Sequence, residues 1–391
     1  MPQNKSKKKI IYIQYTDPAY YPPLAHSSKI LADSGMEILF LGSHVFGDRN
    51  TSFVSHSGIS LKLLPCYGSG WLLKLHYLLF FLWGVFWGAM LRPDWIYASD
   101  LWACPSVYIL KKFFCLKVIY HEHDTPNITN REERSIFLKI VLWFRKKLAK
   151  KADLCVLPNK ERLDYFIKTT GRAKEVIEVW NCPMREEVPT EPSGAKKNGL
   201  QIVYCGSIVS DRLPIAVIKA LSLLPDNVKL TIVGYETIGS IGYVETLLNE
   251  AKKLGLEKRV EFVGRIMNRY ELYGFLGNKD VGLSFIINSV DDVNMQYMVG
   301  ASNKPFEYLA CGMPLLIADL PDWEKMYADQ GYCKSCDPKD SANIAKTLCW
   351  FLEHPEERRV MGERGRQKIL DEWNYEKQFA PVMDYITRHI K

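Results

Sequence analysis

The sequence lacks the cysteine spacing of a metal-binding or disulfide-rich protein. Its ten cysteines are scattered, several of them within apolar runs where a free thiol acts as a small hydrophobic side chain. Only Cys333 and Cys336 have Cys-x-x-Cys spacing, without a second pair or a nearby histidine. We therefore expect no metal site and no redox function there. No secretory signal peptide is recognised, which predicts a cytoplasmic protein in a reducing compartment.

The chain also lacks a strong excess of charge of one sign. It contains 51 lysines and arginines against 44 aspartates and glutamates, a net charge of +7. An excess this mild does not indicate nucleic-acid binding, and we expect no nucleic-acid partner. It suits ligands that carry phosphate, or an anionic membrane surface.

Charge is absent from Tyr77 to Leu91, yet this apolar stretch is short for a membrane span. As a helix it would extend about 22 Å, whereas the hydrocarbon core of a bilayer is about 30 Å thick. Two interpretations remain open: a helix buried between the sheet and another element, or a face that docks on a membrane or an apolar partner. The basic run Arg145 to Lys151, which ends an expected helix over 135–151, favours peripheral membrane contact, although these cations also suit the helix dipole.

What the sequence does contain is enough apolar material for large cores. At 391 residues and 47% hydrophobic content, a prior of about 150 residues per domain predicts two or three domains. Short apolar runs alternate with helical patterns from residues 9–14 to 314–318, as in parallel α/β sheets. A polar stretch at 186–200 is the expected linker between a first domain over 1–185 and a second over 201–370.

The segment from Ser302 to Asp319 is the best-defined local pattern. Ser302 or Asn303 can cap a helix, Pro305 suits its first turn, and Gly312 followed by a proline ends it. The next residues predict a buried strand.

The N-terminus of this short helix is suited to binding a phosphate group. Its first amides are free, and Lys304 lies beside them. If the phosphate belongs to a nucleotide, Glu307, one turn further in, would accept hydrogen bonds from both ribose hydroxyls. The plainer alternative is an amphipathic helix that leads into a core strand, with Glu307 in solvent.

The same segment resembles the donor site of retaining glycosyltransferases of the GT-B fold, in particular the family 4 group (glycosyl transferases group 1). Donor domains of that family carry a Pro-x-Lys-x-x-Glu-Tyr-x-Ala-x-Gly-x-Pro run. The matching positions here are Lys304, Glu307, Tyr308, Ala310, Gly312 and Pro314, with Ser302 in place of the first proline. The resemblance implies an α/β architecture of two Rossmann-like, doubly wound domains facing an interdomain cleft. It also implies a C-terminal helix, over 371–391, that crosses back to the first domain.

By this resemblance the donor diphosphate lies at the loop after the first strand of the second domain. Gly206 and Ser207 stand where the family has Gly-Arg, and Arg212 falls at the position of a family lysine. Arg212 and Lys304, with the amides at Ser302 and Asn303, would then bind the diphosphate and stabilise the charge of the leaving group.

Three further donor contacts are implied at the ends of the neighbouring strands. Gly234 ends the second strand of this domain, as expected for a backbone that approaches the ligand closely. Arg265 and Ile266 follow Gly264, where the family chain passes the nucleobase.

The first domain offers a polar cluster, His121-Glu122-His123-Asp124, where an expected strand ends. Ligands bind beyond the carboxyl ends of strands in open parallel sheets. His123 matches a family histidine near the transferred sugar, which implies that it binds a sugar hydroxyl or positions the acceptor. A metal site built from His121 and His123, or a local structural network, stays open.

The resemblance implies a metal-independent enzyme that needs no cofactor. It would transfer a hexosyl unit, with retention, from a UDP- or GDP-sugar to a glycan or lipid-linked acceptor in cell-surface polysaccharide synthesis. It would be cytoplasmic or peripheral on the inner face of the cell membrane. Two alternatives remain open: a nucleotide-sugar epimerase of the same fold, and a non-catalytic sugar-nucleotide-binding protein. The second is suggested by Ser207 and by Val299, which replaces a family glutamate that contacts the sugar.

Overall fold

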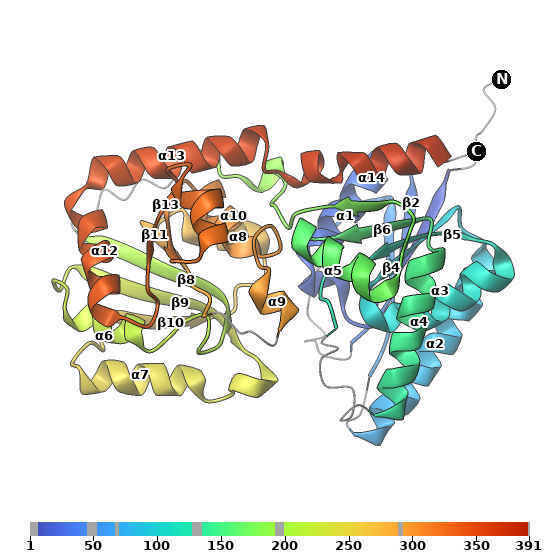
Figure 1. The fold of residues 1–391 in the computed structure, drawn as a ribbon, viewed down its shortest axis with the longest axis horizontal. Helices are drawn as coiled ribbons and strands as arrows, with labels where there is room; N and C mark the ends of the chain where they lie inside the picture. Colours follow the sequence, from blue (N-terminus) through green and yellow to red (C-terminus); the bar gives the residue numbers. More distant parts are fainter. Residues whose placement is uncertain are drawn as a thin grey trace. The chain divides into compact units, whose positions relative to one another are not determined.

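The computed structural model describes residues 7–44, 53–66, 70–126, 135–191, 199–287 and 292–389, and the chain divides into two compact units. Unit 1 comprises Met1–Asn181, Asp291–Ala301 and Tyr375–Lys391, and unit 2 comprises Cys182–Val290 and Ser302–Asn374. Each unit is built on its own parallel sheet (Figure 1). The segment 291–301, which the sequence analysis placed in the second domain, groups with unit 1.

Unit 1 contains a seven-stranded parallel sheet in the order β3-β2-β1-β4-β5-β6-β7. Its strands are β1 (Lys9–Ile13), β2 (Glu37–Ser43), β3 (Ile59–Leu64), β4 (Trp95–Ser99), β5 (Lys117–His121), β6 (Leu154–Leu157) and β7 (Val176–Glu178). The central strands are apolar runs because helices cover both faces of the sheet.

The helices of unit 1 fall into two groups. They are α1 (Pro22–Asp33), α2 (Trp71–Leu91), α3 (Asp100–Phe114), α4 (Ile136–Lys151), α5 (Lys160–Thr170), α9 (Val293–Gln296) and α14 (Tyr375–His389), with the 3₁₀ turn η1 (Pro18–Tyr20). Within the sheet, β2 and β3 are added on one side of β1, and β4 to β7 on the other. Right-handed crossovers therefore place α1 on one face of the sheet and α3, α4 and α5 on the opposite face. The helices α2, α3 and α4 lie side by side (Figure 1), and α14 packs on α1.

Unit 2 contains a six-stranded parallel sheet in the order β10-β9-β8-β11-β12-β13. Its strands are β8 (Leu200–Ile208), β9 (Val228–Glu236), β10 (Val260–Gly264), β11 (Val281–Ser284), β12 (Leu315–Ala318) and β13 (Cys333–Cys336). Its helices are α6 (Ala216–Ser222), α7 (Tyr243–Lys253), α8 (Arg269–Leu276), α10 (Asn303–Ala310), α11 (Pro321–Trp323), α12 (Ser341–Glu353) and α13 (Pro355–Asp371). Short helical turns are η2 (Arg185–Glu187), η3 (Ile238–Ser240) and η4 (Glu324–Ala328).

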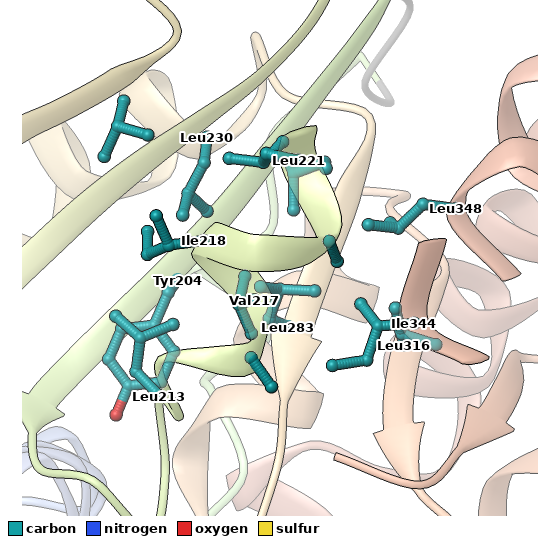
Figure 2. Close-up of a cluster of buried hydrophobic side chains, with 14 of the residues drawn as sticks. Tyr204, Leu213, Val217, Ile218, Leu221, Leu230, Leu283, Leu316, Ile344 and Leu348 are labelled. Carbon is teal, nitrogen blue, oxygen red and sulfur yellow. The ribbon is translucent and has the colours of Figure 1, made fainter. Parts of the chain in front are cut away.

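The core of unit 2 lies between the sheet and helices α6 and α12. Figure 2 shows Val217, Ile218 and Leu221 of α6 directed toward side chains from the strands and from α12. Tyr204 and Leu230 are among them, and both are almost fully buried. This apolar layer fixes the strands whose carboxyl ends carry the candidate donor site.

The fold class expected from the sequence is confirmed, and every predicted strand is present. Two strands were missed: β3, which is only half-buried, and β13. The Cys333 to Cys336 motif forms β13 itself, and all the cysteines are free thiols.

The uncharged stretch from Tyr77 to Leu91 is part of α2, a helix of 21 residues that begins at Trp71. The length of about 22 Å therefore applies to only part of this helix. The interpretation as a buried helix is wrong, because much of α2 is exposed to solvent.

Candidate functional site

The start of α10 carries Lys304 onto the carboxyl end of β8. The side chain of Lys304 covers Gly206 so closely that a Cβ atom at Gly206 would lie 2.7 Å from Lys304 Cε. Its ammonium group lies 5.4 Å from the centre of the Tyr204 ring, and the residue is only 9% exposed. Within the described part of the chain, no carboxylate forms an ion pair with this ammonium group.

Without a paired carboxylate, the Lys304 side chain loses its proton more easily. Burial, followed by the positive charge of Arg212, lowers the pKa of the Lys304 ammonium group from 10.5 to about 7. A cation buried at this cost indicates a place where an anion binds.

Arg212 lies in the loop after β8 and is half-buried. Its Nη1 donates a hydrogen bond to Ser207 Oγ. Ser207, which stands where the resembling family has an arginine, therefore orients the Arg212 guanidinium, a group suited to bidentate contact with phosphate oxygens.

The ends of β8 and β9 approach each other without room for side chains. Gly206 pairs with Gly234 across the two strands, and their φ angles are 126° and 145°. A Cβ atom at Gly234 would lie 1.8 Å from the Gly206 carbonyl oxygen. Only glycine fits these positions, because a side chain would meet Lys304 at Gly206 and the Gly206 backbone at Gly234.

Helix α10 begins at Asn303, as the sequence predicts, but its cap differs from the expectation. Ser302 is the N-cap residue, and its side chain makes no capping hydrogen bond. The first amides of α10 are therefore not satisfied by Ser302, and they open beside Lys304. The Tyr308 hydroxyl accepts a hydrogen bond of 2.7 Å from the Cys205 amide, which ties α10 to the end of β8.

Glu307 is not in solvent, contrary to the plainer alternative. It is 7% exposed, and its Oε1 accepts a hydrogen bond of 3.0 Å from Arg269 Nη1. Arg269 also pairs with Glu187 and donates to the Tyr273 hydroxyl. One carboxylate oxygen of Glu307 is therefore already in use, while within the described residues Oε2 accepts no hydrogen bond.

Arg269 is the site residue that the sequence analysis missed. Although burial opposes its charge, Tyr273, Glu187 and Glu307 together raise its pKa above the ordinary arginine value. Asn268 caps α8 by accepting hydrogen bonds from the Tyr270 and Glu271 amides, so Arg269 is the first residue of a helix that follows a strand end. That capping pattern was the available signal.

The two candidate base contacts lie further along the same edge of the sheet. Arg265 is exposed, and its guanidinium carbon lies 4.5 Å from the centre of the Tyr235 ring. Ile266 is half-buried. Both follow β10, which pairs with β9, so they extend the surface that begins at Gly206 and Gly234.

His123 belongs to unit 1, whereas the other predicted site residues belong to unit 2. Its amide donates to Asp100 Oδ1 at 2.8 Å, and its carbonyl accepts from Arg162 Nη1 at 2.9 Å. The ring lies 3.8 Å from that of His121, centre to centre, and burial lowers the pKa of His123 to about 3. Both ring nitrogens are buried without a hydrogen-bond partner within the described residues.

Neighbouring Glu122 has a structural function instead. It is fully buried and accepts hydrogen bonds from Arg145 Nε and Nη2, at 2.6 and 2.7 Å, and from the Tyr120 hydroxyl. Arg145 therefore points into unit 1, and the expectation that it belongs to an exposed basic run is wrong. Among the described residues, no group of three or more His, Cys, Asp or Glu side chains is placed to hold a metal ion.

Comparison with known proteins found a family match, a related sequence and similar structures. Residues 215–384 match the model of a family described as glycosyl transferase-like. N-acetyl-alpha-D-glucosaminyl L-malate synthase from Bacillus anthracis is 27% identical over 135 residues, which are 34% of this chain and 31% of that relative.

Two similar solved structures cover nearly the whole chain. Anabaena Alr3699/HepE, in complex with UDP, has a TM-score of 0.71 at 17% identity and covers 97% of this chain and 100% of its own. Sucrose-phosphate synthase from Thermosynechococcus elongatus has a TM-score of 0.71 at 15% identity and covers 98% of both chains. The chain has the GT-B glycosyltransferase fold, with two Rossmann-like domains.

Proposed function

We propose that this protein is a glycosyltransferase whose unit 2 binds a nucleotide-diphosphate sugar. The observation that carries the proposal is the nearly buried Lys304 ammonium group, which lies over Gly206 and beside Arg212 with no carboxylate paired to it among the described residues. A diphosphate supplies the missing negative charge. The family match over 215–384, and the similar structures of HepE in complex with UDP and with UDP-glucose, support this choice of donor.

In this proposal, different residues of unit 2 bind different parts of the donor. Arg212, held by Ser207, and Lys304 bind the diphosphate and stabilise the charge that develops on it as the sugar leaves. The amides of Ser302 and Asn303 add hydrogen bonds. The free oxygen of Glu307 accepts a hydrogen bond from the ribose, while Arg269 holds the other oxygen.

The base would lie against Arg265 and Ile266, beyond the ends of β9 and β10. His123, whose ring nitrogens have no partner among the described residues, is proposed to act in turnover rather than in nucleotide binding.

The family resemblance supports transfer of a hexosyl unit with retention, and a lipid-linked glycan as the acceptor. It also supports a function in cell-surface polysaccharide synthesis and a cytoplasmic or inner-membrane-face location. Metal independence is proposed because two fixed cations and the helix amides can carry the leaving-group charge.

Release of nucleoside diphosphate from UDP- and GDP-sugars, with and without lipid-linked acceptors, tests this function. We expect release that depends on acceptor, persists in EDTA, and yields a product whose anomeric configuration by NMR matches that of the donor. His123→Ala should keep donor binding and lose turnover. Isomerised donor in the absence of acceptor would instead identify an epimerase, and binding without any turnover would identify a non-catalytic protein.

A further inference from the structure

Helix α2 turns a continuous apolar face to solvent. Six large side chains on this face are each 46% to 57% exposed: Leu75, Leu78, Leu79, Leu82, Phe86 and Met90. At about 100° per residue they fall within one arc of the helix, opposite the buried residues. An exposed apolar face of this length is unusual for a monomeric protein and marks an interaction surface.

The inner face of α2 is fixed to α3, so the outer face cannot turn inward. A Cβ atom at Gly88 would lie 2.4 Å from Leu110 Cδ1, which shows how closely the two helices pack. The Tyr77 hydroxyl also donates a hydrogen bond of 2.9 Å to the Trp102 carbonyl. Within the described residues, α2 is the one helix long and apolar enough to cross a membrane, but these contacts hold it in the domain.

Helix α4, which packs on α3 as α2 does, exposes a second apolar row. Ile136, Ile140 and Trp143 are 77%, 51% and 50% exposed, and they recur at the i, i+4, i+7 spacing of one helix face. The Phe137 ring lies 5.4 Å from that of Tyr77, centre to centre, so the two helices meet. We call these six residues of α2 and three of α4 the α2–α4 face.

The charged side chains of α2 and α4 are of one sign. Neither α2 nor α4 contains an aspartate or a glutamate, and α4 exposes Lys139, Lys146, Lys147 and Lys150. The Lys147 ammonium group lies 5.2 Å from the centre of the Trp143 ring. Tryptophan beside lysine, next to aliphatic side chains, is the arrangement found where proteins meet lipid headgroups.

The same charges argue against a second copy of the chain as the partner. In a symmetric dimer the same patch faces itself, so these lysines would approach one another. An anionic bilayer supplies both an apolar interior and the opposite charge.

We propose that the α2–α4 face docks unit 1 peripherally on an anionic lipid bilayer. The leucines, isoleucines and aromatic rings enter the boundary between headgroups and acyl chains, and the lysines remain among the anionic headgroups. This inference deepens the inner-membrane-face location of the proposed function by naming the docking surface, and its test is separate because it needs neither donor nor acceptor.

Vesicle flotation of the full chain tests the proposal, with phosphatidylglycerol-containing or pure phosphatidylcholine vesicles. We expect flotation with the anionic vesicles, weaker in high salt, and at least about tenfold weaker partitioning for Leu82→Ser/Phe86→Ser. Lys146→Glu/Lys150→Glu should reduce the same binding. The matched control is Ile238→Ser, which changes an apolar side chain 83% exposed in unit 2 and should leave flotation unchanged.

Three results would overturn the proposal. Failure of the wild type to float with any vesicle would exclude docking. Resistance to extraction at alkaline pH would indicate a spanning helix. Dimers in analytical ultracentrifugation that Leu82→Ser/Phe86→Ser abolishes, without vesicle binding, would assign the face to a second copy. None of these results bears on the proposed donor site, because donor binding is measured in a separate experiment.

Discussion

Lys304 is the residue on which the donor site depends most. Its pKa of about 7 in the free protein means that the amine is partly neutral at neutral pH. A diphosphate binds the ammonium form, so binding should take up a proton at and above pH 7. The affinity should therefore fall as pH rises above 7, by up to about tenfold per unit. Calorimetry in buffers of different ionisation enthalpy measures that proton uptake.

Lys304→Arg serves as the control, because an arginine stays protonated over this range. It should retain binding without the proton uptake. Binding by the wild type that releases protons, or that strengthens with rising pH, would contradict the assignment.

Arg269 forms ion pairs with two carboxylates, Glu187 and Glu307, that are both nearly buried. In Arg269→Met, Glu187 and Glu307 lose their shared partner, and we expect the free energy of unfolding to fall by about 3 to 5 kcal/mol. Urea denaturation followed by fluorescence measures the loss. A second change, Glu187→Gln, should recover part of it by removing one of the two negative charges that Arg269 compensates. A single variant as stable as the wild type would show that the network is weak.

At the scale of the element, the site depends on the close approach of β8 and β9. Gly234→Ala places a methyl group on the Gly206 carbonyl and keeps an unfavourable φ angle, so the strand ends must separate. We expect a loss of about 2 kcal/mol or more in stability and weaker nucleotide binding. Thermal unfolding with and without UDP measures both effects.

Gly239→Ala is the matched change nearby, since a Cβ atom at Gly239 meets nothing within 4 Å. It should alter stability by less than about 0.5 kcal/mol. Equal effects of the two substitutions would refute the close-approach explanation.

The sequence predicts elements well where one local pattern determines them. The strands with continuous apolar runs and α10, with Ser302 before it and Gly312 after it, are found where expected. The strand β3 was missed because its half-buried residues show no such run. The direction of a side chain is harder to predict, because Arg145 and Arg269 are oriented by Glu122 and Glu187, which lie 23 and 82 residues away in the sequence.

At the scale of the molecule, the last helix belongs to the first unit. Helix α14 buries Tyr375, Phe379, Val382 and Ile386 within unit 1, and its Tyr385 hydroxyl donates to the Asp153 carbonyl at 3.0 Å. Each such side chain contributes about 1.5 to 3 kcal/mol, so their loss approaches the whole stability of a domain.

Phe379→Ala should therefore destabilise unit 1 by about 3 to 5 kcal/mol, because it leaves a cavity in a packed core. Calorimetric unfolding should show the loss in one transition, and UDP should still stabilise the other. Thr387→Ala, on the exposed side of α14, is the control and should have little effect. A shift confined to the UDP-responsive transition would contradict the placement of α14 in unit 1.

The most direct test of the donor site is titration calorimetry of nucleosides and nucleoside diphosphates with the wild type, Lys304→Met and Arg212→Met. We predict that uridine or guanosine binds weakly, that its diphosphate binds at least about a hundredfold more tightly, and that either variant removes most of this difference. Equal affinities for nucleoside and diphosphate, or a diphosphate affinity unchanged by both substitutions, would contradict the account.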